Sequence, residues 1–223
     1  MKEHFDEKRE VLKWIAIGTM TIDHTGAVLY PSILWLRLVG RLSFPLFSYL
    51  LVLGVDTTRN LRNYLLRLLL FAAISQPSFY LALGDDWLVP LNIFFTLSLG
   101  VLLLNSFKRA NPLLALIPLL ASFVLDIDYG IYGVATIGCT YLLTKAAKLG
   151  VLSLVALNLI FIFTETPSQF LSLLALPMIL SHRSDIYVKE GNNTTVYPLW
   201  RKLFFYVYYP LHLTALFLVK MAM

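Results

Sequence analysis

The sequence predicts an all-α fold, that of a polytopic integral membrane protein with about nine transmembrane helices and a cytoplasmic N-terminus. Three observations support this prediction. The chain has 223 residues, of which 58% are hydrophobic and only 14% charged, and its mean hydropathy is +0.74. The apolar residues gather in runs of about 15 to 22, longer than the core of a water-soluble protein needs. Basic residues fall in every second loop between these runs, as in chains that cross a membrane repeatedly.

Hydropathy places the nine candidate spans, in order, at about residues 14–30, 33–53, 62–83, 91–107, 112–126, 131–146, 149–165, 167–182 and 198–220. The spans near 112–126 and 149–182 are short enough to be tilted, re-entrant or fused. Residues 1–13 carry both charge signs and lack the small-residue cleavage site of a signal peptide, so we expect them to form a cytoplasmic segment before a retained anchor. No soluble domain is visible, and residues 1–223 are predicted to form a single transmembrane domain.

The charges of the loops predict the orientation. One set of loops is basic and contains Lys2, Lys8, Arg9, Lys13, Arg59, Arg62, Lys108, Arg109, Lys145, Lys148, Arg183, Lys189, Arg201 and Lys202. The intervening loops have no lysine or arginine and contain Asp85, Asp86, Asp126, Asp128 and Glu165. The positive-inside rule therefore places the N-terminus in the cytoplasm and the C-terminus outside, in the cell membrane.

Composition also excludes some kinds of site. Cys139 is the one cysteine and lies in an apolar stretch, which excludes an intramolecular disulfide and a cysteine-based metal site. No metal site is predicted. The net charge of +5 follows from the basic loops and indicates a lipid bilayer as the surroundings, with no nucleic acid partner.

Ionisable side chains from three predicted spans fall in one layer of the membrane. His24 lies ten residues into the first span, roughly 15 Å from the cytoplasmic edge, and His212 reaches a similar depth in the last. Arg41 enters from the opposite side, on the order of 12 Å below the outer face. Because a charge at this depth costs at least about 2.5 kcal/mol, we expect these groups to face the interior of the bundle, a partner or water.

The layer has a structural interpretation as well as a functional one. For Arg37, Gln76, Asn92 and Asn158, a packing network is the favoured interpretation. Asp23 and His24 are sequence neighbours, which point about 100° apart on a helix, so Asp23 is expected to pair with another helix, with Arg41 as the candidate partner. The alternative is that Asp23 orients His24, and Asp23 is therefore counted with His24, Arg41 and His212 as a candidate catalytic residue. The candidates for substrate binding are the polar residues Gln76, Asn92, Asp126 and Asp128.

A second set of residues lies at the predicted cytoplasmic edge and could hold a phosphorylated ligand through cationic side chains. Each one taken alone is expected to anchor topology, and Arg67, which lies inside its span, is the best candidate for a ligand contact. The set comprises Lys13, Arg59, Arg62, Arg67, Arg201 and Lys202.

Six stretches in order resemble the TraX family of membrane proteins, whose named member is required for N-terminal acetylation of conjugative pilin. They run from about residue 12 to 215 and read "LKWIAIGTMTIDHTGAVLYP", "LRLVGRLSFPLFSYLLVLG", "TTRNLRNYLLRLLLFAAISQPSFYLALG", "LNIFFTLSLGVLLL", "DIDYGIYGVATI" and "FFYVYYPLHLTAL". This family is similar in turn to the transmembrane acyltransferase superfamily, in which a basic residue, ten residues and an essential histidine occupy the first span. Lys13 and His24 have that spacing. The chain departs from the larger enzymes in its span number and in "FPLFSYLLVLG", where they carry more glycine and serine.

The resemblance implies a single transmembrane acyltransferase domain with His24 as the catalytic histidine. It also implies acetyl-CoA as a donor reached from the cytoplasm, and a protein or glycan acceptor at the outer half of the membrane. Neutral imidazole suits the role of base, and Arg41, Asn92 or His212 could stabilise an oxyanion. O-acetylation of a glycan or lipid-linked substrate is the alternative activity. A secondary transporter would show inverted halves with broken helices, which the sequence lacks, and a purely structural partner of an assembly would not require the spacing from Lys13 to His24.

Overall fold

The computed structural model describes residues 7–84, 90–162, 167–188 and 199–223, and every regular element in these ranges is a helix. The predicted all-α class is therefore confirmed. In chain order the elements are α1 (Glu7–Val28), α2 (Leu34–Gly40), α3 (Ser43–Thr57), α4 (Leu61–Leu83), α5 (Ile93–Lys108), α6 (Pro112–Val124), α7 (Gly130–Lys145), α8 (Ala147–Phe161), the 3₁₀ helix η1 (Pro167–Ala175), α9 (Leu176–Val188) and α10 (Leu199–Ala222).

The prediction of nine spans is not supported by the helix lengths. Within the described ranges, three helical segments are long and apolar enough to cross a membrane, namely Leu34–Thr57, Leu61–Leu83 and Leu203–Ala222. The apolar helices α5 and α8 have 16 and 15 residues, and at 1.5 Å per residue they rise only about 24 Å, less than a hydrocarbon core of about 30 Å. Hydropathy overcounted because it registers apolar runs and does not see where the helices end.

The chain breaks two of the predicted spans and lengthens another. The span predicted at 33–53 is divided between α2 and α3 by a turn at Arg41 and Leu42. The span predicted at 167–182 consists of η1 followed by α9. The segment predicted as cytoplasmic at residues 1–13 is helical from Glu7 onward, because α1 begins two turns before the apolar run.

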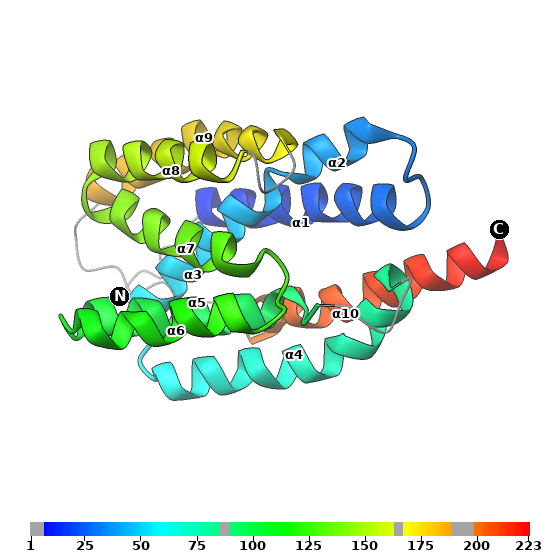
Figure 1. Ribbon diagram of the computed structural model, residues 1–223, viewed down its shortest axis with the longest axis horizontal. Coiled ribbons are helices and arrows are strands. Elements are labelled where there is room, and N and C mark those ends of the chain that lie inside the picture. The colour runs from blue at the N-terminus through cyan, green and yellow to red at the C-terminus, as the bar shows by residue number, and fades with distance from the viewer. Residues whose placement is uncertain (1–6, 85–89, 163–166, 189–198) are drawn as a thin grey trace.

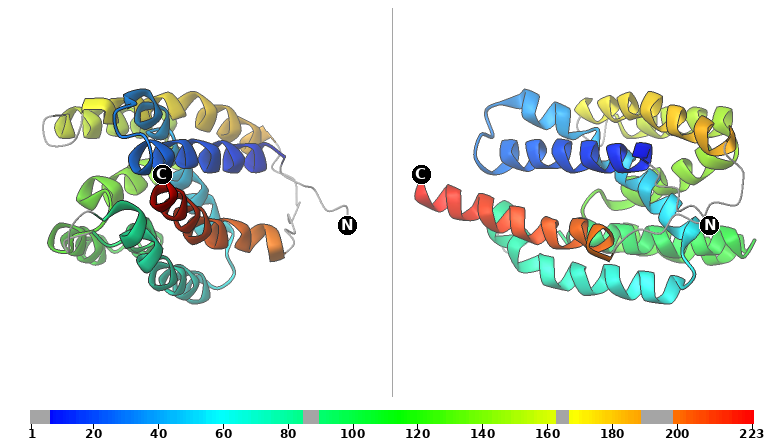
Figure 2. Two further views of the ribbon diagram at one scale, coloured as in Figure 1. Left: turned by 90° about the vertical axis from the view of Figure 1, so that its right-hand side faces the viewer. Right: turned by 180° about the vertical axis from the view of Figure 1, so that it is seen from behind.

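Most of the helices lie roughly along the long axis of the molecule, α3 and α7 cross it obliquely, and α1, α4 and α10 run in the same direction (Figure 1). Side-chain contacts fix this register. Between α1 and α10, Trp14 lies against Phe204 and His24 against His212, with ring centroids 5.1 and 5.0 Å apart. Between α4 and α10, Ser78 is hydrogen-bonded to Thr214. The second half of α10 extends past the rest of the bundle (Figures 1 and 2).

Asparagine side chains begin three of the helices. Asn60, Asn92 and Asn111 each accept a hydrogen bond from a backbone N–H in the first turn of α4, α5 and α6. These caps satisfy amide groups that have no partner inside the helix. The sequence therefore marks where these helices start, although hydropathy alone does not.

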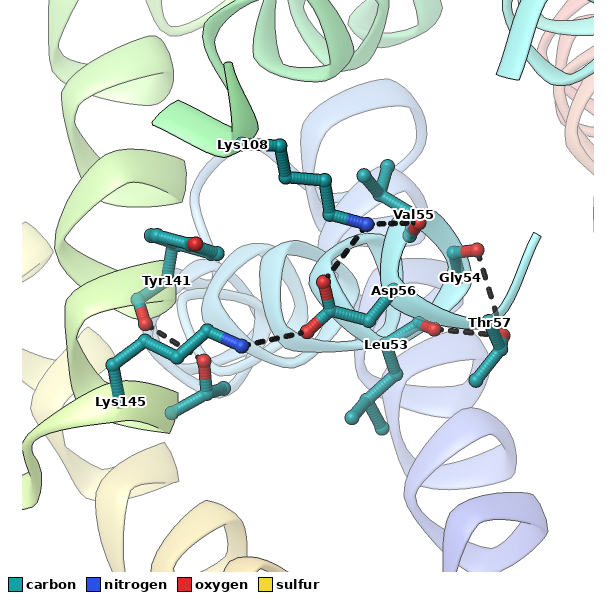
Figure 3. A network of polar contacts seen from close by, with 9 residues as sticks. Leu53, Gly54, Val55, Asp56, Thr57, Lys108, Tyr141 and Lys145 are labelled. Atoms are coloured by element: carbon teal, nitrogen blue, oxygen red, sulfur yellow. Dashed lines mark hydrogen bonds and ion pairs between the residues drawn. The ribbon is translucent and has the colours of Figure 1, made fainter. Parts of the chain in front are cut away.

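The ends of α3, α5 and α7 meet around one carboxylate (Figure 3). Asp56 of α3 lies 3.0 Å from the ammonium group of Lys108 and 3.3 Å from that of Lys145. Lys108 also donates to the Val55 carbonyl, 2.6 Å away. Both lysines lie in the last turn of their helices, where the helix dipole favours a positive charge. Their ion pairs with Asp56 join the three helices at one end of the bundle.

Two glycines allow α1 and α2 to approach closely. A Cβ atom on Gly26 of α1 would lie 2.7 Å from the Leu36 Cβ, and one on Gly40 of α2 would lie 2.1 Å from the carboxylate of Asp23. Neither distance is compatible with a real side chain. The backbone of α2 therefore lies directly against Asp23, and only glycine leaves room for the carboxylate.

We expect Gly40→Ala to destabilise the protein by about 1–3 kcal/mol, because the added methyl group must displace Asp23. Gly18→Ala is the matched control, since nothing lies within 4 Å of a Cβ at Gly18, and alanine favours a helix over glycine by up to about 1 kcal/mol. Thermal unfolding of the purified protein in detergent measures both. Equal stability of the two variants would contradict the close packing of α2 on Asp23.

Candidate functional site

A cavity of about 200 Å³ lies between α1, α2, α3, α4, α5, α10 and the turn from α6 to α7. One part of its wall is charged or titratable, and the rest is mainly aromatic and aliphatic. Its lining consists of Met20, Asp23, His24, Ala27, Arg37, Arg41, Ser43, Phe44, Phe47, Phe79, Leu83, Ile93, Leu97, Asp128, Tyr129, Phe205 and Tyr209.

His24 and His212 form the central contact of this site. The Nδ1 atom of His24 lies 2.7 Å from the Nε2 atom of His212, and the two rings are nearly parallel. His24 lines the cavity, whereas His212 is buried behind it. Both predicted histidines are thus brought together, four residues before the end of α1 and in the middle of α10.

Hydrogen bonding around His212 determines which nitrogen of His24 carries a proton. The Nδ1 atom of His212 lies 2.9 Å from the carbonyl oxygen of Tyr208, which can only accept, so this Nδ1 is the protonated nitrogen. The Nε2 atom of neutral His212 then has a lone pair, and His24 must donate to it from its own Nδ1. The Nε2 atom of His24 is consequently left as an unprotonated nitrogen, suited to accept a proton.

The side chain of Tyr208 supports the same arrangement. Its ring is stacked on that of His212 with centroids 5.0 Å apart, and its hydroxyl is 2.7 Å from the hydroxyl of Thr21 on α1. Tyr208 is not among the residues predicted from the sequence. Its position four residues before His212 on a helix was the available signal, because residues with this spacing share a face.

Asp23 pairs with Arg37, so the prediction that Arg41 is its partner was wrong. The Asp23 Oδ2 atom lies 2.7 Å from Arg37 Nη1, which also donates to the Asp23 carbonyl at 3.2 Å. Arg41 lies one turn further on, in the break between α2 and α3, and lines the cavity. The helix break explains the difference, because α2 ends before Arg41 and leaves Arg37 facing α1.

The turn between α6 and α7 places Asp128 in the cavity wall. The Asp128 N–H donates to the Leu91 carbonyl, and the Leu91 N–H donates to the Asp126 carbonyl, both at 2.8 Å. The next residue, Tyr129, has a φ of +63°, a left-handed conformation that is uncommon outside glycine, and its ring is stacked on Phe44. The sequence predicts a loop here, between the spans at 112–126 and 131–146, but not the left-handed conformation of Tyr129.

Removal from bulk water raises the pKa of Asp128 to about 7, and the nearby charge of Asp23 adds to this effect. Arg37, the backbone N–H of Tyr129 and Arg41 oppose it with smaller contributions. Asp128 therefore changes its charge close to neutral pH. The carboxylate is only partly withdrawn, since the side chain has intermediate exposure and forms part of the cavity wall.

Three other predicted substrate-binding residues lie away from the cavity lining. Gln76 and Asn92 bond to each other, with Asn92 Nδ2 donating to Gln76 Oε1 at 2.7 Å and to the Ala72 carbonyl at 2.8 Å. These contacts fasten the start of α5 to α4. Asp126 is exposed in the turn. A role for these three residues in substrate binding stays a prediction.

The predicted basic residues that are described lie at the common starting end of α1, α4 and α10. Arg59 and Arg62 are exposed, and Lys13 is half-buried. The guanidinium group of Arg67 lies over the rings of Tyr64 and Tyr206, 5.5 and 5.4 Å from their centroids. Arg201 and Lys202 begin α10, although their side chains, and the loop residues Lys2, Asp85, Asp86, Glu165 and Lys189, lie outside what the structure describes.

Comparison with known proteins identifies relatives along the whole chain. The family model described as TraX protein matches residues 8–220. A probable fimbrial assembly protein FimC, serogroup H1, from Dichelobacter nodosus is 30% identical, and the alignment covers 99% of each chain. Protein TraX from Escherichia coli strain K12 is 32% identical over 36% of this chain and 32% of its own length. A second Protein TraX from Escherichia coli is 28% identical over 62% of this chain and 57% of its own. No solved structure matches.

We expect Asp23→Asn to reduce stability by about 2–4 kcal/mol, because it leaves the Arg37 guanidinium in the bundle without its carboxylate. Combining it with Arg37→Gln should restore part of the loss, since both charges are then removed. Asp56→Asn is the control for an exposed ion pair, with an expected loss of less than about 1 kcal/mol. Denaturation curves in detergent test the cycle, and strictly additive losses would contradict a direct pair.

Proposed function

This chain belongs to the TraX family, and on that premise we propose that it is a membrane-embedded acetyltransferase acting on a pilin-like protein. The proposed donor is acetyl-CoA on the cytoplasmic side of the cell membrane. The proposed acceptor is the N-terminal amine of a pilin-like protein at the outer half of the membrane. The name of the FimC relative, a probable fimbrial assembly protein, supports a role linked to pilus assembly.

The observation that carries the proposal is the state of His24. Its Nδ1 donates to His212, its other nitrogen is unprotonated, and its side chain lines a cavity large enough for a small reacting group. A general base needs a lone pair and a fixed orientation, and the hydrogen bond to His212 supplies both. The spacing from Lys13 to His24, which resembles that of the acyltransferase superfamily, points to the same residue.

The proposed reaction transfers the acetyl group in two steps. The neutral amine nitrogen attacks the thioester carbonyl carbon while His24 Nε2 accepts a proton from that nitrogen, forming a C–N bond and an oxyanion. When the oxyanion collapses, the C–S bond breaks and the CoA thiolate takes the proton from His24, giving free CoA and the acetylated amine. The imidazole ends neutral, as it began.

Arg41 is the proposed stabiliser of the oxyanion. Arg41 and His24 both line the cavity, and Arg37 forms the ion pair with Asp23. A cationic hydrogen-bond donor next to a developing negative charge stabilises the transition state more than the ground state. His212 is assigned a positioning role, because it contacts His24 and does not line the cavity.

The basic end of the bundle is the proposed entrance for acetyl-CoA. Arg67 lies between two tyrosine rings, and Tyr206 is stacked in turn on Phe94, whose ring meets that of Tyr209 beside His24. Cationic and aromatic groups suit the phosphates and adenine of CoA. From Lys13 to His24 the helix rises about 16 Å, so a pantetheine arm would have to bridge that distance.

The same distribution of charge supports the proposed orientation, with the starting ends of α1, α4 and α10 in the cytoplasm. With Cys139→Ala as background, we expect a membrane-impermeant thiol reagent added outside cells to modify Asp126→Cys but not Arg109→Cys. Both positions are exposed, so access to the reagent is not limited by packing. Modification of position 109 but not of position 126 would show that the orientation is the opposite of the one proposed.

We expect His24→Asn to lower acetyl transfer by about 10² to 10⁴-fold, the usual contribution of a general base. The assay uses labelled acetyl-CoA, protein in lipid nanodiscs and a synthetic apolar peptide with a free N-terminal amine. His212→Gln should retain more activity than His212→Leu, because the amide oxygen can still accept the hydrogen bond from His24.

Acetyl-CoA binding provides the control for this series. His24→Asn and His212→Leu should bind acetyl-CoA as the wild type does, whereas Arg67→Glu should bind it weakly, and increasingly so at high salt. Near-normal transfer by folded His24→Asn protein would exclude His24 as the base. Absence of both binding and hydrolysis of acetyl-CoA by the wild type would overturn the proposed activity itself.

A further inference from the structure

The cavity contains two carboxylates in different situations. Asp23 is neutralised by Arg37 at 2.7 Å. Among the described residues, no lysine, arginine or histidine lies within 4.0 Å of the Asp128 carboxylate. One acidic group of the cavity is therefore engaged in the packing of α1 on α2, and the other is available to a ligand.

The backbone holds Asp128 in a fixed place. Its N–H and that of Leu91 tie the α6–α7 turn to the segment before α5, and its carbonyl accepts from the hydroxyl of Thr96. The left-handed Tyr129 that follows stacks on Phe44, another residue of the cavity wall. A group presented on such a braced turn has little freedom to move away from a ligand, so it can discriminate between ligands.

We propose that Asp128 recognises the acceptor as an ammonium group and so selects amine over hydroxyl acceptors. This inference rests on the proposed acetyltransferase function and adds the residue that selects the amine acceptor. A carboxylate forms a charge-assisted hydrogen bond with an ammonium group, whereas a hydroxyl gains only a neutral donor contact. The aromatic and aliphatic remainder of the lining suits the apolar side chain that follows the amine.

Asp128 also provides a destination for the first proton of the acceptor. An α-ammonium group has a pKa of about 7.7–8.0, close to the value of about 7 to which Asp128 is raised. Transfer of one proton converts the ammonium and the carboxylate into a neutral amine and a carboxylic acid at small cost. The amine can then attack, and Asp128 returns its proton to water before the next acceptor binds.

Other groups around Asp128 must be considered in any measurement of pH dependence. Those that line the same cavity or act on its charge are Asp23, His24, Arg37, Arg41, Tyr129 and Tyr209. Asp23 and Arg37 form an ion pair. The tyrosines stay neutral between pH 6 and 8.5, and burial raises the pKa of Tyr129 further above its ordinary value. Because His24 is a second titratable group in the cavity wall, a variant of Asp128 is needed to assign the effect.

The test compares hexylamine with hexanol as probes, using the full chain in nanodiscs and calorimetric measurement of binding. Hexylamine stays cationic between pH 6 and 8.5, as an alkylamine similar to lysine, while Asp128 ionises within that range. For the wild type we expect hexylamine affinity to rise tenfold or more across this interval, and hexanol affinity to stay constant. Asp128→Asn should abolish the rise, whereas Asp56→Asn, which removes a carboxylate outside the cavity lining, should preserve it.

Binding of the two probes with equal affinity would overturn the inference, as would a rise in hexylamine affinity that persists in Asp128→Asn or complete absence of hexylamine binding. If Asp128→Asn does not fold, the wild-type comparison of amine with alcohol decides the question. Selective binding without acetyl transfer would support this inference and reject the proposed function. Acetyl transfer without amine selectivity would support the proposed function and reject the role of Asp128 in selecting the acceptor.

Discussion

The ion pair between Asp23 and Arg37 is the contact on which the arrangement of the site depends. It joins α1 to α2 at a point where Gly40 brings the α2 backbone against the carboxylate. An unpaired charge in this position would be costly. Separating the two helices would leave each charged group without its partner and only partly solvated. The pair thereby fixes the face of α1 that turns toward α2 and, with it, the rotation of the helix about its axis.

That rotation determines where His24 lies. Neighbouring residues on a helix point about 100° apart, so with Asp23 directed toward α2, His24 is directed toward α10 and the cavity. There it meets His212, which the Tyr208 carbonyl holds in one tautomer. The adjacent residues Asp23 and His24 therefore have different roles. Asp23 anchors α1 in the bundle, and His24 retains an unprotonated nitrogen that can accept a proton.

The sequence allowed part of this site to be predicted, and the reasons are physical. Depth along apolar runs correctly grouped His24 with His212, because parallel helices keep residues of equal depth together. It led to Arg41 in place of Arg37 as the partner of Asp23, since both lie at suitable depth and only the break after Gly40 distinguishes them. The position of Asp128 depends on a left-handed residue and a backbone contact with Leu91, neither of which leaves a pattern in the sequence.

The helical class was equally accessible, but the number of spans was not. Apolar composition predicts helices in lipid, whereas the length of each helix depends on local breaks and caps such as Asn92 and Asn111. These irregular positions also form the site: Arg41 lies in the break between α2 and α3, and Asp128 in the turn before α7. Non-helical backbone within an apolar bundle is tolerated where it lines a cavity, because the freed polar groups find partners there. The departures from a simple set of spanning helices are therefore the places where this chain can present charged groups to a ligand.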